Sequence, residues 1–208
     1  MRSSGMFAKR KEDSMSASRR IVAWAGVSLD GHTSGPGGPA HDTWLHEAAT
    51  HPQTSEYFEG IWRGADTIVL GRTSYEGFYS VWPGITRDEN TEPRTRELGR
   101  WLDATEKVVV SRSLTEAPWE NSRIARDLAA EVEALRKGPG RDVLVANSAS
   151  VIGELLRLDL LDDLRLFMVP VLLGGGLRLF PDGVDARFAT VGVTALANGV
   201  VGLHLTRP

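Results

Sequence analysis

Five short apolar segments, separated by longer stretches, constrain the fold of this chain more than any other feature of its sequence. They are IVAWAGVSL (21–29), DTIVLG (66–71), KVVVS (107–111), DVLVA (142–146) and LRLFMVPVLL (164–173). Strands that alternate with helices are typical of an α/β sheet. Because runs such as VVV and VLV are apolar at consecutive positions, we expect central strands that helices cover on both faces.

Several of the intervening stretches have helical periodicity. Residues 55–63 place Phe58 and Trp62 four positions apart, and residues 150–161 align Leu158 with two other apolar side chains. Such stripes indicate helices that pack against a core rather than contacts to a cofactor.

The C-terminal part contains three features that shape the sheet. Segments 186–196 and 200–207 predict an antiparallel hairpin, which makes a mostly parallel central sheet mixed. Pro170 indicates a break in the ladder or a sheet edge, and such an edge can pair across a dimer. The glycines at 174–176 precede the apolar segment 177–180, which is strand-like rather than a capped helix, so they predict a bend or bulge.

The length favours one domain. A chain of 208 residues corresponds to about 1.4 domains of typical size, and no linker or repeat divides it after residue 20. Residues 1–18 are polar and mixed in charge without periodicity, which predicts a disordered leader before a domain at 19–208. A mitochondrial transit peptide is the alternative, but Glu12 and Asp13 argue against it.

Composition excludes several classes of protein. The 24 basic and 27 acidic residues give a net charge of -3, so no global field attracts nucleic acid or an anionic membrane. The absence of cysteine excludes disulfides, a thiol nucleophile and thiolate zinc sites. No apolar run reaches the roughly 18 residues of a spanning helix, so we expect a cytoplasmic protein.

Small and polar residues follow three of the apolar segments, where each strand is expected to end. Glycine allows close backbone approach, Ser and Thr cap helices, and helix N-termini attract phosphate. Arginine adds a charged fork that suits a phosphomonoester. Since ligands of open sheets bind at the strand carboxyl ends, a dinucleotide site is indicated. The three loops are Gly71, Arg72, Thr73 and Ser74; Ser111, Arg112 and Ser113; and Asn147, Ser148, Ala149 and Ser150.

Each loop also fits a capped helix or an ordinary polar turn. Neither GxGxxG nor GxxxxGK[ST] occurs in the chain, so neither an ordinary Rossmann domain nor a P-loop nucleoside triphosphatase is indicated. Spacing alone therefore leaves the ligand open.

A family resemblance narrows the choice. The chain resembles the dihydrofolate-reductase-like superfamily and is most similar to the reductase domain of bacterial riboflavin biosynthesis and its stand-alone relatives. The resemblance covers about residues 20–207. The segments that carry it are VSLDG (27–31), LGRTSYE (70–76), VVSRSL (109–114), NSASVIGELL (147–156) and LLDDLRLFMVPVLLGGGLRLF (160–180).

The resemblance implies a three-layer α/β fold, NADPH across the strand carboxyl ends, and hydride delivery to a carbon–nitrogen double bond. Residues 71–74 match the motif that holds the cofactor phosphates, with Arg72 at the position associated with the 2′-phosphate. Residues 111–113 match the loop beside the adenosine, and residues 147–150 match the turn under the pyrophosphate. Gly26 is expected near the nicotinamide.

Two departures from the family pattern leave the substrate open. Asn147 stands where relatives usually have glycine, although asparagine tolerates left-handed backbone better than most residues. The loop 31–44 lacks the Pro-Trp signature of true dihydrofolate reductases, and the DDPxLTVR-like segment of committed riboflavin enzymes is absent after Gly71.

Three residues are candidates for chemistry on the substrate. Asp30 follows the first strand and is able to orient the substrate or relay a proton; the alternative is an Asp-Gly turn. Asp42 and Trp44 offer a carboxylate and a stacking ring for a heterocycle; the alternative is a surface loop anchored by one tryptophan.

A metal site is not expected. His32, His41, His46 and His51 cluster in the sequence, but their spacing matches no standard zinc motif.

The sequence thus predicts an NADPH-dependent reductase that acts on the C=N or C=O bond of a small polar heterocycle, with a homodimer as the expected assembly. Three alternatives remain. They are a 5-amino-6-(5-phosphoribosylamino)uracil reductase of riboflavin biosynthesis, a weak dihydrofolate reductase, and a non-catalytic nucleotide-binding module.

Overall fold

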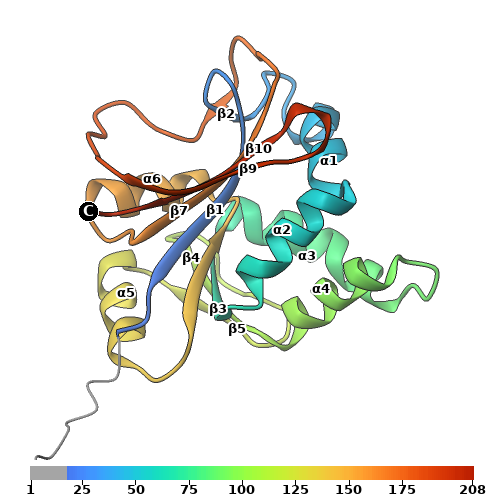
Figure 1. The fold of residues 1–208 in the computed structure, drawn as a ribbon. Coiled ribbons are helices and arrows are strands. Elements are labelled where there is room, and N and C mark those ends of the chain that lie inside the picture. The colour runs from blue at the N-terminus through green and yellow to red at the C-terminus, as the bar shows by residue number, and fades with distance from the viewer. Residues whose placement is uncertain (1–17) are drawn as a thin grey trace, which may run out of the picture.

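The computed structural model describes residues 18–208, so residues 1–17 of the predicted leader lie outside the described residues. At its centre is an eight-stranded sheet with the order β5-β4-β3-β6-β1-β7-β10-β9 (Figure 1). The strands are β1 (Ile21–Ser28), β3 (Ala65–Gly71), β4 (Glu106–Val110), β5 (Ser122–Ala125), β6 (Asp142–Ala146), β7 (Asp163–Val169), β9 (Ala189–Ala195) and β10 (Val201–Thr206).

The sheet is mixed, as the sequence predicts. The strands from β5 to β7 in this order pair in parallel; in the centre, Ala23 of β1 lies opposite Val145 of β6 and Leu164 of β7. β10 runs antiparallel to both β7 and β9. The C-terminal hairpin is therefore confirmed.

Helices cover both faces of the sheet, which gives three layers (Figure 1). One face carries α5 and α6, and the other carries α1 to α4. The helices are α1 (Thr43–Thr50), α2 (Pro52–Trp62), α3 (Arg72–Arg87), α4 (Pro93–Ala104), α5 (Leu128–Lys137) and α6 (Ala149–Arg157), with short 3-10 turns η1 (Pro39–His41) and η2 (Ala197–Gly199).

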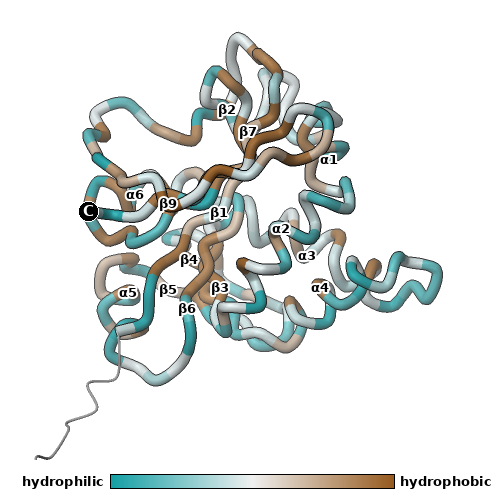
Figure 2. Tube along the Cα trace, in the orientation of Figure 1, coloured by the Kyte–Doolittle hydropathy of each residue, from teal (hydrophilic) through white to brown (hydrophobic). Residues whose placement is uncertain are grey.

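Two hydrophobic cores result, one on each face. Successive residues of a strand point to opposite faces, so Ala23 and Val27 of β1 join the core under α5 and α6, whereas Trp24 joins the core under α1 to α4. Every residue of β1 is buried, as expected for a central parallel strand. Figure 2 shows hydrophobic residues concentrated along these central strands.

The structure corrects two details of the sequence analysis. Helix α6 ends at Arg157, so Leu158 leaves the predicted stripe and is 42% exposed. Strand β7 ends at Val169, and Pro170 lies just beyond it, which confirms the break in the ladder. A sheet edge at this position is wrong, because β7 lies between β1 and β10 and the edges are β5 and β9.

The glycines at 174–176 form the expected bend. Gly174 and Gly176 have φ angles of +70° and +113°, and a Cβ at Gly176 would lie 2.1 Å from the carbonyl oxygen of Ser34. Only glycine tolerates this close approach. Of the following apolar segment only β8 (Leu177–Arg178) is extended, and it pairs with β2 (His32–Ser34) in a separate small sheet.

Candidate active site

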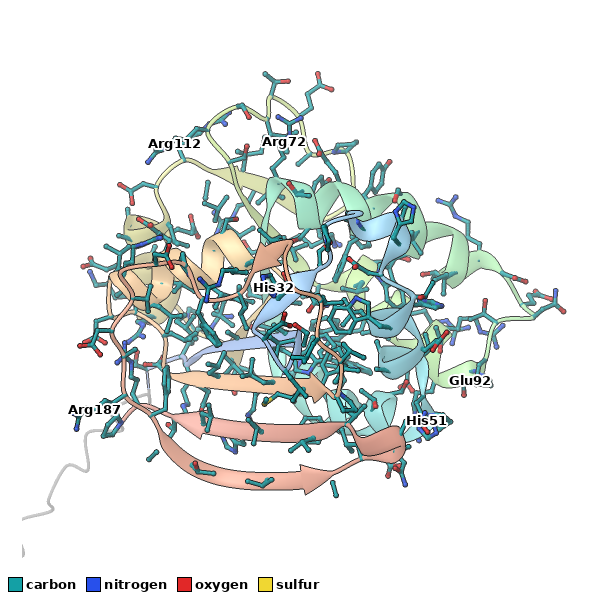
Figure 3. The ribbon with its side chains drawn as sticks, turned by 90° about the horizontal axis from the view of Figure 1, so that it is seen from above. His32, His51, Arg72, Glu92, Arg112 and Arg187 are labelled. Carbon is teal, nitrogen blue, oxygen red and sulfur yellow. The ribbon has the colours of Figure 1, made fainter. Side chains whose placement is uncertain are left out.

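The three polar loops meet at one edge of the sheet because the strands that precede them are neighbours. β4, β3 and β6 are adjacent and parallel, so their carboxyl ends lie together. Figure 3 shows Arg72 and Arg112 projecting from this edge, away from Glu92 and His51. The structure thus brings together the loop residues that the sequence analysis selected.

Hydrogen bonds join the loop after β3 to the loop after β6. The Ser74 hydroxyl donates to the backbone oxygen of Asn147 (2.9 Å), and the backbone N–H of Gly71 donates to the Ser148 hydroxyl (3.0 Å). A Cβ at Gly71 would lie 3.2 Å from Ser150 Oγ and 3.3 Å from Val151 Cγ2. The absence of a side chain at Gly71 therefore lets the two loops approach closely.

Arg72 joins the loop after β3 to the loop after β4. Its Nη1 donates to the Ser113 hydroxyl (3.2 Å), while its Nε donates to Glu76 one helical turn ahead (2.9 Å). The side chain is still 53% exposed. Ser111 shapes the second loop from below, since its hydroxyl accepts the backbone N–H groups of Ser113 (3.3 Å) and Leu114 (3.0 Å).

Helices α3 and α6 start directly from these loops. Neither has a side-chain N-cap hydrogen bond, so N–H groups of both first turns are free to bind an anion. Thr73 lies exposed in the first turn of α3, and Ala149 is buried in the first turn of α6. Ser150, the next residue, is exposed and lines the groove described below.

A groove of about 450 Å³ lies between α5 and α6 and reaches the loop after β4 and the start of α6. It contains a residue that sequence reasoning missed: the Arg126 Nη1 donates to the backbone oxygen of Ser111 (2.6 Å). The signal in the sequence was an arginine between two elements: Arg126 follows the short polar strand β5 and precedes Asp127, the N-cap of α5. The charged and hydroxyl side chains that line the groove are Ser111, Arg112, Arg126, Asp127, Ser150 and Glu154.

Asn147 links the loops to strand β1. Its φ of +47° is left-handed, a conformation that asparagine tolerates better than most residues. Its backbone N–H donates to the oxygen of Trp24 (2.8 Å), and its Oδ1 accepts the N–H of Gly26 (3.2 Å). Gly26 is tightly enclosed, because a Cβ there would lie 2.3 Å from both Leu45 Cδ1 and Phe167 Cζ.

A second hollow, of about 320 Å³, lies on the opposite face of the sheet beneath α2, α3 and α4. We call it the aromatic cavity. Sequence reasoning assigned Phe58 and Trp62 to the core only. The helical pattern of Phe78 and Trp82 on α3 was the available signal. The aromatic cavity reaches Ala146 and Asn147 at the end of β6, and its aromatic residues are Trp24, Phe58, Trp62, Phe78, Trp82 and Trp101.

Asp30 fixes the loop after β7. Its carboxylate accepts the N–H of Gly174 (2.7 Å) and the hydroxyl of Ser28 (2.7 Å). These bonds, from Ser28 first and then Gly174, hold the pKa of the Asp30 carboxyl well below its usual range. His32 Nδ1 lies 3.5 Å from the same carboxylate.

Asp42 and Trp44 hold their own loop. Asp42 is buried, and its Oδ1 accepts the N–H of Gly35 (2.8 Å) and the indole N–H of Trp44 (3.1 Å). Neither residue, nor Asp30, lines the groove or the aromatic cavity. The structure therefore brings the candidate cofactor residues together, but it places Asp30, Asp42 and Trp44 outside both the groove and the aromatic cavity.

Two kinds of feature are absent from residues 18–208. Within that range no helix is long and apolar enough to cross a membrane. The same part of the chain holds no group of three or more His, Asp or Glu side chains placed to hold a metal ion.

Comparisons with known proteins identify the class. The family match and the shared fold define a reductase of the riboflavin-biosynthesis type, an oxidoreductase with the predicted dihydrofolate-reductase-like fold. The RibD C-terminal domain family model matches residues 19–202, so the chain belongs to that family. Uncharacterized protein YyaP of Bacillus subtilis (strain 168) is 33% identical over 165 residues, which cover 79% of this chain and 81% of YyaP.

Solved structures share the fold at lower identity. A putative riboflavin biosynthesis protein from Shewanella sp. PV-4 has a TM-score of 0.67 at 20% identity, covering 91% of this chain and 99% of that one. A diaminohydroxyphosphoribosylaminopyrimidine deaminase/5-amino-6-(5-phosphoribosylamino)uracil reductase from Thermotoga maritima has a TM-score of 0.63 at 14% identity, covering 92% and 57%. Riboflavin biosynthesis reductase Rib7 of Saccharomyces cerevisiae has a TM-score of 0.57 at 17% identity, covering 91% and 90%.

Proposed function

We propose that this reductase uses NADPH and delivers hydride to the C=N or C=O bond of a small heterocycle. The observation that carries the proposal is the pair of hydrogen bonds, Ser74 to Asn147 and Arg72 to Ser113, that joins three phosphate-type loops into one surface. A dinucleotide needs such a continuous surface because its phosphates and its reacting ring are far apart.

The residues present fit a phosphorylated dinucleotide. The open first turns of α3 and α6 suit a pyrophosphate, because their N–H groups and helix dipoles favour negative charge. Arg112 and Arg126 supply guanidinium groups in the groove, and Arg72 supplies one beside the neighbouring loop through its bond to Ser113, which suits the additional charge of a 2′-phosphate. When bound, NADPH supplies the hydride; the chain positions it.

Asn147 lines the aromatic cavity where the loops meet it, and Gly26 donates its N–H to Asn147, so both are the proposed contacts at the reacting end. Asp30, Asp42 and Trp44 remain proposed residues of the acceptor site. Because none of them lines the aromatic cavity, their proposed role there is to orient an acceptor through the loops that they hold rather than by contact. Hydrogen bonds keep Asp30 ionised, so it is not the proposed proton donor.

Calorimetric titration of Arg72→Ala tests the cofactor assignment. Loss of a charge-assisted hydrogen bond of about 1.5–3 kcal/mol raises the Kd for NADPH by about 10–150-fold and leaves NADH within about threefold. Arg87→Ala, at the far end of the same helix, is the matched control and changes neither Kd. Equal losses for NADPH and NADH would remove the 2′-phosphate assignment. NADPH binding without oxidation across pterins, aminouracils and imines would favour a non-catalytic module.

The second candidate is reduction of 5-amino-6-(5-phosphoribosylamino)uracil, which the name of the Thermotoga maritima neighbour supports. The homodimer and the cytoplasmic location also remain proposals. For the dimer, the edge strand β9 offers a surface, since Val191 and Val193 are 56% and 64% exposed. Sedimentation measurements of wild type and Val193→Lys test that contact.

A further inference from the structure

We propose that the aromatic cavity takes a planar, largely apolar fused-ring imine as hydride acceptor, rather than a sugar phosphate. This inference deepens the proposed function and rests on it for the source of the hydride. It departs from the polar heterocycle that the sequence suggests. Three properties of the cavity carry it: its walls, its charges and one buried donor.

Aromatic side chains from β1, α2, α3 and α4 line the cavity, whereas α1 contributes only His46, Ala49 and Thr50. Trp24 stacks on Phe58 with ring centroids 3.9 Å apart and an interplanar angle of 23°. On α3, Phe78 and Trp82 meet edge to face at 6.3 Å, and both are only half buried although they line the hollow. The partly exposed rings of Phe78 and Trp82 beside a cavity favour a flat apolar ring and penalise a hydrated ribose.

The charges of the cavity do not suit a phosphate. Among the described residues that line it, Arg94 is the one arginine or lysine. Its Nε is paired with Glu59 Oε2 at 2.9 Å, and Glu59 is also bonded to Arg63. A phosphate entering here would have to compete with that carboxylate, and burying an unpaired anion is costly.

One residue that lines the cavity, Trp24, has a buried N–H group that lacks a hydrogen-bond acceptor among the described residues. Trp24 lines the cavity and is 5% exposed, and within residues 18–208 its indole Nε1 has no hydrogen-bond partner. A buried N–H without a partner is unfavourable. Because less than 1 Å² of this nitrogen is accessible, the nitrogen of an imine ring satisfies it when the indole or a neighbouring side chain moves on binding.

The reaction balances with components already named. Reduction of a C=N bond adds one hydride to carbon, and the π electrons of that bond take one proton at nitrogen. The hydride comes from NADPH, which leaves as NADP⁺, and water supplies the proton. The product is the saturated cyclic amine.

Calorimetry on the full chain, under mildly alkaline conditions that keep the imine neutral, tests the proposal with 3,4-dihydroisoquinoline and uridine 5′-monophosphate as probes. We expect the imine to bind with a Kd at least about tenfold below that of the nucleotide. Ala49→Phe fills the cavity from α1 and abolishes imine binding. Ala134→Phe, on the exposed face of α5, is the matched control and leaves binding unchanged. Tighter binding of the nucleotide, or imine binding that Ala49→Phe does not reduce, overturns the proposal.

Trp24→Phe removes the indole N–H and keeps an aromatic ring at the same position. A lost hydrogen bond weakens binding by about five- to tenfold, so the variant loses that affinity for 3,4-dihydroisoquinoline and not for 1,2-dihydronaphthalene, which lacks the nitrogen. Equal losses for both rings overturn the role of Trp24. NADPH titration in parallel separates the two proposals. If the imine binds and NADPH does not, the proposed function fails and the cavity assignment stands; if NADPH binds and the imine does not, the cavity assignment fails alone.

Discussion

The hydroxyl of Ser74 donates a 2.9 Å hydrogen bond to the backbone oxygen of Asn147, a residue 73 positions further along the chain. This bond connects the first turn of α3 with the turn that precedes α6. Both turns belong to the surface proposed to bind the cofactor. The relative position of the two helix starts therefore depends in part on one serine hydroxyl.

Ser74→Ala is expected to weaken NADPH binding. Loss of a hydrogen bond between the two loops weakens the binding free energy by about 0.5–1.5 kcal/mol. Calorimetry is expected to show a roughly two- to tenfold higher Kd for NADPH. Ser80→Ala is the control, because the Ser80 hydroxyl bonds only to Gly77 within the same helix. If both variants bind NADPH like the wild type, the bond between the loops has no part in cofactor binding.

Substitution of Asn147 is expected to separate backbone strain from side-chain bonding. Asn147→Ala puts alanine at φ +47°. Unlike asparagine, alanine has no polar side chain that hydrogen-bonds locally, so we expect the free energy of unfolding to fall by about 1–2 kcal/mol. Asn147→Gly removes that strain and loses only the bond to Gly26, so its cost is smaller. Urea denaturation measures both. An alanine variant as stable as the glycine variant would show that the left-handed backbone is not maintained.

Two glycine substitutions are expected to have opposite effects on stability. Gly26→Ala places a methyl group 2.3 Å from Leu45 and Phe167, and overpacking of this kind costs about 1–3 kcal/mol. Gly60→Ala lies in α2 with nothing within 4 Å of the new methyl group, and helix propensity predicts a gain of about 1 kcal/mol. Thermal unfolding of the pair checks the sign of each change, and a Gly26→Ala protein that melts at the wild-type temperature contradicts the close packing.

Lys107 is expected to make stability depend on pH in the alkaline range. The side chain is fully buried and donates to backbone oxygens in the last turn of α4 and to that of Thr105 just after it, at 2.8 Å. Burial lowers the pKa of Lys107 to about 8, against about 10.4 in an unfolded chain. Between these values the unfolded state binds more protons, so the contribution of Lys107 to the unfolding free energy rises with pH. Below pH about 8 the cost of the buried charge is fully present.

Lys107→Met removes this titration. We expect the difference in unfolding free energy between wild type and variant to shift in favour of the wild type as pH rises from about 8 to about 10. Urea denaturation at several pH values in this interval measures it. A difference that stays constant with pH would show that Lys107 titrates normally.

The sequence predicts the layered sheet and the loop cluster because both depend on local signals. Runs such as VVV at 108–110 end in polar residues, and parallel neighbours bring those ends to one edge. Strand β5 lacks such a run, since Ser122 and Arg123 make half of it polar. Because this strand is not predicted from the sequence, Arg126, which follows it, is not selected as a site residue either.

The aromatic cavity could not be predicted from local signals. Phe58, Phe78 and Trp101 come from three different helices, and an apolar stripe has the same spacing whether it meets another side chain or an open space. Asp42 shows the converse. Its place in a Gly-rich loop suggests an available carboxylate, but its oxygen bonds Gly35 and Trp44, and only the folded loop reveals this.

The aromatic cavity has a practical consequence for identifying its occupant. The chain contains six tryptophans, and Trp24, Trp62, Trp82 and Trp101 all line that one hollow. A molecule that enters therefore lies close to four of the six indole rings of the protein. Intrinsic fluorescence of the unlabelled chain therefore serves as a built-in reporter, with which a compound library can be screened before any turnover assay exists.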